Sequence, residues 1–289
     1  TDSDLSFGTA ASFSSDVSNY VVADFLDSTH VAIAWTGPST AYLGKSVIGT
    51  ISGTSVSFGT VVDLNYATTP QAMAPTVAVL DSTHFVVADS ADGTFGRARV
   101  GTVSGGNSIS YGTPASFTAG GSVLSNGSMD SVGLDSTHFV LIYTSGETEN
   151  NRSAGIVGTV SGGSTISYGS ENVFLSGGAS TSQKITKLDS TTIVIAYKDT
   201  NTGFGIAVVA NVLTGTSLSF GTNITFNSAA TNDIDITALS ASKIFIAYEN
   251  GSISPPGKGV VGTISWPSIS FGTAVTFHSG SSGVSALAV

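Results

Sequence analysis

The sequence contains no cysteine, so disulfide frameworks, thiolate metal sites and thiol catalysis are all excluded. Charge is also scarce, since 10% of the 289 residues are charged, far below the roughly 25% usual for soluble domains. Only nine residues are Lys or Arg and the net charge is −10. Nucleic acid and anionic membranes need basic patches, so we expect neither as a partner.

Long apolar runs are missing as well. The mean hydropathy is +0.30, yet no run approaches the roughly 20 residues of a membrane-spanning helix, so we expect no membrane insertion. The Thr1-Asp2-Ser3 start lacks the basic and apolar regions of a signal peptide. We expect any such peptide to have been removed already.

Short strings recur along the whole chain. The string Leu-Asp-Ser-Thr-His begins at Leu26, Leu80 and Leu134, and it continues in altered form at Leu188 and Leu239. The period is about 54 residues and leaves no room for a linker, so we expect residues 1–289 to form one domain built as a repeat array. A second string, Ser-Phe/Tyr-Gly-Thr/Ser, occurs six times, with its glycines at Gly8, Gly59, Gly112, Gly169, Gly221 and Gly272.

Each repeat contains four segments with strand character. An apolar run such as 76–80 enters the Asp-Ser-Thr segment, in which Asp is suited to an Asx turn. The next run, as at 85–88, is continuously β-branched or aromatic, which indicates a strand buried on both faces. A variable polar loop leads to a third run such as 157–160, and a Ser-Gly turn leads to an alternating fourth segment such as 108–111.

Four-stranded meanders at this period predict an all-β fold, a β-propeller of four-stranded antiparallel blades. A β-solenoid is excluded, because its repeats are shorter and its strands are parallel. Five blades are complete in the chain. We prefer a six-bladed plan whose last blade is unfinished, and a five-bladed ring is the alternative.

The two ends of the chain carry spare segments. Leu5–Thr9 matches a fourth strand ahead of any blade, and Val284–Val289 matches a first strand after the last one. Unpaired strands expose backbone donors and acceptors, so we expect both ends to be ordered as strands. At least one should pair with a neighbouring blade or another copy of the chain, which would give a homo-oligomer or polymer.

The loops after the second strand vary in length and sequence, whereas the other turns are uniform. Varied loops serve recognition, so we expect any ligand on their face of the ring. Aromatic residues also end the second strand in four of five copies. They either stack on sugars or fill gaps between blades, and gap filling is the favoured interpretation. The candidate ligand-binding residues are Trp35, Tyr42, Phe95, Asn150, Tyr197 and Phe204.

Two patterns raise the question of a metal. His30, His84 and His138 occupy equivalent repeat positions, but adjacent blades lie at least about 10 Å apart, too far for ligands about 2 Å from one ion. Asp199 and Asn201 place oxygens on alternate residues and form a weak calcium candidate. We expect turn-flanking histidines and no cofactor.

Catalysis finds little support in the sequence. Sialidases share the propeller shape, but a sialic carboxylate needs arginines converging from several blades. The chain has only Arg97, Arg99 and Arg152, two of them on one short stretch. We see no paired carboxylates at matched blade positions and no nucleophile–base pair. The expectation is a protein without catalytic residues, which is not an enzyme.

The strings Leu-Asp-Ser-Thr-His-Phe-Val-Val-Ala, Val-Gly-Thr-Val-Ser-Gly and Ser-Ile-Ser-Phe-Gly-Thr cover essentially the whole chain. In them the chain resembles propeller repeats of large secreted or surface proteins from environmental microbes and their viruses. The resemblance implies an extracellular location and display, adhesion or scaffolding. We therefore expect a non-enzymatic binding or adhesion propeller, lectin-like or protein-binding, with a glycan or surface protein as partner. The alternative is a structural subunit of an extracellular assembly, such as a surface layer, filament or viral appendage.

Overall fold

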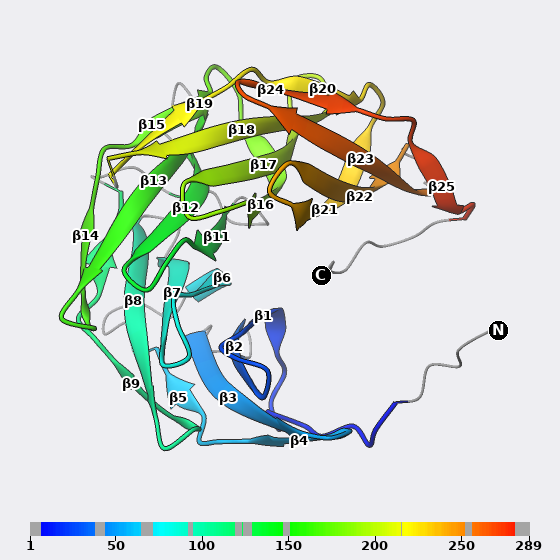
Figure 1. The fold of residues 1–289 in the computed structure, drawn as a ribbon. Helices are drawn as coiled ribbons and strands as arrows, with labels where there is room; N and C mark the ends of the chain where they lie inside the picture. Colours follow the sequence, from blue (N-terminus) through cyan, green and yellow to red (C-terminus); the bar gives the residue numbers. More distant parts are fainter. Residues whose placement is uncertain are drawn as a thin grey trace.

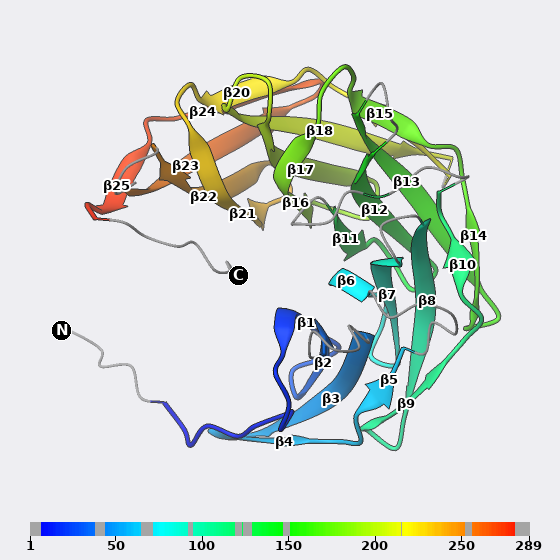
Figure 2. The ribbon, with the colours of Figure 1, turned by 180° about the vertical axis from the view of Figure 1, so that it is seen from behind.

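The computed structural model describes residues 7–37, 44–64, 72–91, 95–118, 123, 129–146, 151–214, 216–251 and 256–280. Within these ranges the chain forms five antiparallel sheets and no helix. The sheets are arranged as blades around a common axis (Figure 1). The expected all-β propeller is confirmed, and the first and last blades face each other across an open sector (Figures 1 and 2).

Each blade contains five strands, which we call a to e in chain order. Blade 1 consists of β1 (Asn19–Phe25), β2 (His30–Thr36), β3 (Gly44–Ser52), β4 (Ser55–Phe58) and β5 (Val62–Asp63). Blade 2 consists of β6 (Ala72–Val79), β7 (His84–Ala91), β8 (Phe95–Ser104), β9 (Ser108–Tyr111) and β10 (Ala115–Ser116). Blade 3 consists of β11 (Met129–Gly133), β12 (His138–Ser145), β13 (Arg152–Ser161), β14 (Thr165–Tyr168) and β15 (Asn172–Leu175). Blade 4 consists of β16 (Ser180–Lys187), β17 (Thr192–Asp199), β18 (Gly205–Leu213), β19 (Ser217–Phe220) and β20 (Ile224–Asn227). Blade 5 consists of β21 (Thr231–Ser240), β22 (Lys243–Asn250), β23 (Gly257–Ser265), β24 (Ser268–Phe271) and β25 (Val275–His278).

Strands a to d form the predicted meander, with strand a nearest the axis (Figure 1). The short strand e is an addition, because the sequence showed only a return at this place. In blade 3, the second half of strand c pairs with β14 through Gly158–Ser161, and its first half pairs with β15 through Ser153–Gly155. Strands d and e therefore follow one another along the same edge of strand c.

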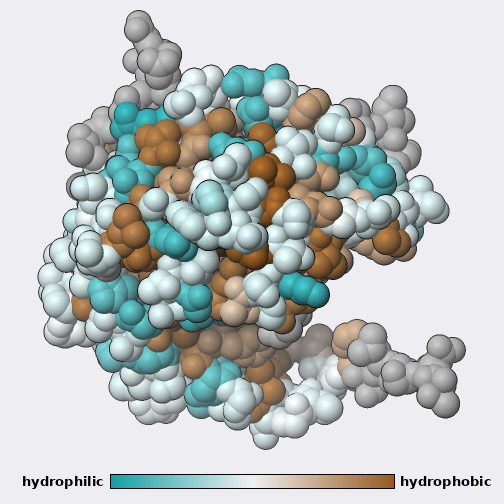
Figure 3. All heavy atoms as spheres, turned by 45° about the horizontal axis from the view of Figure 1, so that its top comes forward, coloured by the Kyte–Doolittle hydropathy of each residue, from teal (hydrophilic) through white to brown (hydrophobic). Residues whose placement is uncertain are grey.

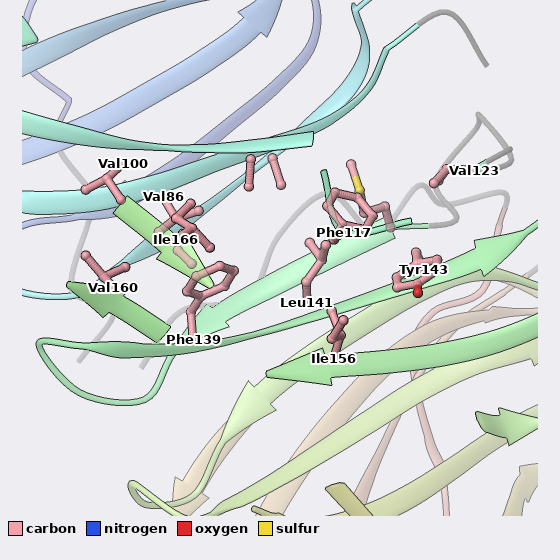
Figure 4. Close-up of a cluster of buried hydrophobic side chains, with 14 of the residues drawn as sticks. Val86, Val100, Phe117, Val123, Phe139, Leu141, Tyr143, Ile156, Val160 and Ile166 are labelled. Carbon is pink, nitrogen blue, oxygen red and sulfur yellow. The ribbon is translucent and has the colours of Figure 1, made fainter. Parts of the chain in front are cut away.

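The apolar core lies between successive blades (Figure 4). Alternate side chains of strand b in blade 3 enter two different clusters. Phe139, Leu141 and Tyr143 pack with residues of blade 2, whereas Val140 and Ile142 pack with residues of blade 4. All five are fully buried, which confirms that strand b is covered on both faces.

The motif glycine after strand d marks the contact from one blade to the next. A Cβ atom on Gly169 would overlap the carbonyl oxygen of Thr216, which lies in the turn between strands c and d of blade 4. Only glycine leaves room for this close approach. The same contact with the next blade is made by Gly59, Gly112 and Gly221.

The motif glycines at the two ends behave differently from one another. Gly8, ahead of blade 1, packs against the c–d turn of that blade at Thr54, as the other motif glycines do. Gly272 has no such neighbour, and the nearest atom to its Cβ position is the carbonyl oxygen of Val261, 3.8 Å away. Residues 7–9 form no strand, because the described chain contains no strand c with which they could pair. The strand expected over Leu5–Thr9 is therefore wrong in its described part. The expected strand at Val284–Val289 lies outside the described residues.

The Asp-Ser-Thr segments form the expected Asx turns. Asp81 Oδ1 accepts hydrogen bonds from the Thr83 amide (2.7 Å), the Thr83 hydroxyl (2.8 Å) and the His84 amide (2.8 Å). His84 Nδ1 lies 3.0 Å from Asp81 Oδ2, so the histidine flanks the turn. Desolvation opposes ionisation of Asp81, but these hydrogen bonds outweigh it and lower its pKa below 3.8.

Substituting the motif glycine should expose its dependence on the next blade. We expect Gly169→Ala to lower the free energy of unfolding by about 1–3 kcal/mol, because the methyl group collides with the Thr216 carbonyl. The matched change Gly272→Ala should stay within about 0.5 kcal/mol, as for an ordinary surface change. Urea unfolding measures both. Equal losses in the two variants would contradict this account of the contact.

The turn carboxylates make stability depend on pH. Hydrogen bonds lower the pKa of Asp81, Asp135 and Asp189 below 3.8, so each carboxylate stabilises the fold above that value and loses this contribution as the pH falls below it. We expect the free energy of unfolding to drop below about pH 4, and to drop less steeply in Asp81→Asn. Unfolding curves between pH 2 and 6 give the slopes. An unchanged slope in this variant would refute the assignment.

Candidate functional site

The inner strands of the blades surround a cavity of about 460 Å³. Strands a of all five blades contribute to its wall, which lies where these strands approach the axis in Figure 1. The lining residues are Val21, Val22, Ala23, Asp24, Val77, Asp130, Ser131, Val132, Lys184, Ile185, Asp235 and Ile236.

Three carboxylates and one ammonium group stand among these apolar residues: Asp24, Asp130, Asp235 and Lys184. The pairing of strands a and b puts Asp130, Lys184 and Asp235 at the same level in blades 3, 4 and 5. Asp130 and Asp235 therefore form a pair at matched blade positions. We expected no such pair from the sequence, and this expectation was wrong.

A β-bulge precedes two of these side chains. The register of strands a and b shifts between Thr181 and Lys184 in blade 4, and between Asn232 and Asp235 in blade 5. Within the two shifts, Ser182 and Asp233 adopt left-handed φ angles of 51° and 43°. Bulges re-aim the side chains that follow them, and here the following residues line the cavity.

The carboxylates also connect the inner strands of successive blades. Asp130 Oδ2 accepts a hydrogen bond of 3.0 Å from the backbone amide of Ile185 in blade 4. Asp24 Oδ2 accepts one of 3.2 Å from the amide of Val79 in blade 2. Each of these carboxylates thus has a structural role, in addition to any role toward a ligand.

Burial changes the acidity of Asp130 and Asp24. Desolvation raises the pKa of Asp130 above 3.8, against the opposing effect of Lys184 and of two backbone amides, while the charge of Asp235 adds to the rise. Burial likewise raises the pKa of Asp24. A carboxyl group with a raised pKa keeps its proton to a higher pH than an exposed one, and such groups concentrate at sites of proton transfer.

Two of the aromatic candidates belong to the core. Trp35 and Tyr197 are fully buried. The ring of Phe13 lies 4.9 Å from that of Trp35, and the ring of Phe174 lies 5.3 Å from that of Tyr197. A buried ring has no free face for a sugar. Tyr197 fills the space between blades 3 and 4, and Trp35 lies beneath Phe13 of the segment ahead of blade 1.

The remaining candidates are not brought together at one place. Phe95, at the start of β8, is 41% exposed, and Phe204 is half-buried in the loop between β17 and β18. Tyr42 and Asn150 lie outside the described residues, as do most of the loops on the varied face.

The calcium candidate holds its own loop together. Asp199 is buried, its Oδ1 accepts a hydrogen bond of 3.0 Å from the amide of Asn201, and its Oδ2 accepts one of 2.9 Å from the hydroxyl of Thr202. In the part of the chain that the structure describes, no three acidic or histidine side chains are grouped as a metal would require. The candidate therefore remains an expectation from sequence.

The cavity residues were missed at first, although the sequence carries a signal for them. Asp24, Asp130 and Asp235 are charged residues inside segments that the repeat assigns to the inner strand. Such a residue is costly to bury and therefore points to a site. Arg97, Arg99 and Arg152 do not line the cavity, and Arg152 instead forms an ion pair of 3.0 Å with Glu171.

No family model matches the sequence, and no curated protein matches it. Solved structures share the fold at low identity. The Hadza microbial sialidase Hz136 is 7% identical, with a TM-score of 0.54 over 91% of this chain, which spans 59% of the sialidase. A mutant of AofleA from Arthrobotrys oligospora is 10% identical, with a TM-score of 0.54 over 90% of this chain and 73% of that one. A thermostable family-43 glycoside hydrolase is 11% identical, with a TM-score of 0.51 over 92% of this chain and 96% of the hydrolase.

These matches identify the fold as a β-propeller and correct one expectation. From the sequence we expected a non-enzymatic binding propeller or a structural subunit, partly because no catalytic pair was found. The matched structures include a sialidase and a glycoside hydrolase, so this blade arrangement is one on which glycosidases are built.

Among the described residues, no helix is long and apolar enough to cross a membrane.

Substitutions at Asp130 separate its charge from its hydrogen bonds. Because the folded-state pKa is raised, ionisation destabilises the fold as the pH rises above 3.8, so Asp130→Asn should be at least as stable as the parent at pH 7. Asp130→Ala should cost about 1–3 kcal/mol, because the Ile185 amide loses its acceptor. Thermal unfolding at pH 4 and pH 7 measures both. Equal losses in the two variants would contradict the burial argument.

Proposed function

We propose that the chain, taken as a single propeller domain, hydrolyses glycosidic bonds in its axial cavity. The observation that carries this proposal is the Asp130 and Asp235 pair at one level of that cavity. Glycoside hydrolysis requires two carboxyl groups, one holding a proton and the other ionised. The raised pKa of Asp130 fits the proton-holding role.

The two groups divide the reaction between them. Asp130 donates its proton to the glycosidic oxygen as the bond from that oxygen to the sugar carbon breaks. The Asp235 carboxylate stabilises the positive charge that develops at the sugar carbon and directs the attack of water. Water supplies the hydroxyl group of the new reducing end and the proton that restores Asp130. Lys184, at the same level in the intervening blade, limits the mutual repulsion of the two carboxyl groups.

The charge of the cavity points to a neutral glycan. Three carboxyl groups and one ammonium group line it, and with Asp130 protonated the two remaining carboxylates still outnumber the ammonium group, so an anionic sugar such as a sialic acid would be repelled. The three arginines that could bind a carboxylate bidentately lie elsewhere. Val21, Val77 and Ile236 offer apolar surface to the C–H face of a sugar ring. With the resemblance to secreted and surface repeat proteins, this supports an extracellular glycan as substrate.

The test is hydrolysis of a panel of aryl glycosides and polysaccharides of neutral sugars. We expect turnover of at least one member, reduced a hundredfold or more in Asp130→Asn and in Asp235→Asn, as for the loss of a general acid or its partner. Asp16→Asn changes an exposed carboxylate outside the cavity and should keep the parent rate. Thermal unfolding would confirm that each variant is folded. No turnover across the panel, or full turnover in both cavity variants, would overturn the proposal.

A further inference from the structure

Each blade turns one face toward the blade that follows it in the chain. On blade 5 a strand c residue of this face is exposed, whereas its equivalents in the other four blades are buried. Val261 on strand c of blade 5 is 40% exposed. The register of strands c and d makes it equivalent to residues that are 0% exposed in blades 1 to 4, where the next blade covers them. These equivalents are Ile48, Val100, Val157 and Val209.

Strand e of the same blade repeats this difference. Phe277 on β25 is 58% exposed, whereas its equivalents Phe117 and Phe174 are 6% exposed beneath the next blade. Gly272 lacks the neighbouring turn that other motif glycines contact. We call Val261, Gly272, Val275 and Phe277 the open face of blade 5. Its side chains fit a blade-to-blade contact that nothing in the described chain completes.

The opposite wall of the sector is partly covered by the start of the chain. The ring of Phe13 lies 4.9 Å from Trp35 and 5.9 Å from Phe58. Phe174 of strand e in blade 3 makes the same two contacts in blade 4, at 5.3 Å from Tyr197 and 5.5 Å from Phe220. Together with the Gly8 contact, this puts residues 7–13 where strands d and e of a preceding blade would lie.

The inner part of this wall is uncovered. Tyr20, Val21 and Phe25 on strand a of blade 1 are 46%, 47% and 57% exposed. Residues 7–13 do not cover them, because strands d and e lie at the outer edge of a blade (Figure 1). Figure 3 shows the sector as a notch in the molecular surface, with apolar side chains along its walls.

We propose that the sector receives strands a, b and c of a sixth module of the same repeat, which the residues at 7–13 complete as strands d and e. One face of the added sheet would cover the open face of blade 5, and the other would cover Tyr20, Val21 and Phe25. Its strand c would supply the partner that residues 7–9 lack in the described chain.

A second complete copy of the chain fits the sector less well. Stacking blade 5 of one copy on blade 1 of another would bring Phe277 to the position over Trp35 that Phe13 already occupies. The occupant must therefore bring strands a to c without d and e. This requirement distinguishes a sixth module from a head-to-tail polymer.

The absence of cysteine allows a direct test by thiol labelling. Residues 178–213, which contain strands a to c of blade 4, are joined after Gly280 in place of 281–289. Val261→Cys is introduced into the parent chain and into this extended chain. We expect the maleimide labelling rate to fall at least tenfold in the extended chain. The matched variant Val173→Cys, at a residue 42% exposed on blade 3, should label equally fast in both.

Three results would overturn the proposal. The first is unchanged labelling of Val261→Cys in a folded extended chain. The second is protection of this cysteine in the parent chain that rises with protein concentration alongside a dimer in light scattering, which would assign the face to a second copy. If the extended chain does not fold, the extension is repeated with 129–161 of blade 3. Failure of both extensions to fold would be the third, because a sector shaped for this module should accept either.

Discussion

The structure depends on one close contact, in which the carbonyl oxygen of a turn lies against the bare Cα of the motif glycine in the blade before it. At Gly169 and Thr216 this contact fixes how near two sheets approach. That approach lets Phe174 reach both Tyr197 and Phe220 in the next blade. It also brings the inner strands within hydrogen-bonding distance of one another, as the bond from the Ile185 amide to Asp130 shows. The cavity is thus a product of blade spacing.

Asp24 and Asp130 in that cavity combine a favourable and an unfavourable contribution to stability. They accept backbone hydrogen bonds across blades, which an amide side chain could do without charge. Burial meanwhile raises the pKa of Asp24 and Asp130, so their ionised forms cost stability. A charged group kept where a neutral one would hold the strands better is the pattern expected of a site selected for chemistry.

Much of the fold could be predicted because the repeats are close copies. The alternating segment at 108–111 matches β9 in full, and the Asx turns form at the predicted aspartates. Strand e was missed because it is only two to four residues long and continues the edge begun by strand d. Trp35 was placed among binding candidates because sequence cannot show that Phe13 covers it. Asp130 and Asp235 were missed because the two inner strands share no string of their own, although each aspartate stands four residues before a repeat leucine, Leu134 or Leu239. Their pairing with strand b confirms the common level.

The position of residues 7–13 has a consequence for the order of folding. Contacts within each blade join strands that are at most two strands apart in sequence, so successive blades can form as the chain leaves the ribosome. The segment around Gly8 and Phe13 is synthesised before these five blades, and it packs against blade 1. If a last blade is added to this ring, residues 7–13 therefore already lie at the place of its strands d and e before its strands a to c are formed. The slow step of ring closure then becomes a local docking event, with the loss of chain entropy already incurred early in synthesis.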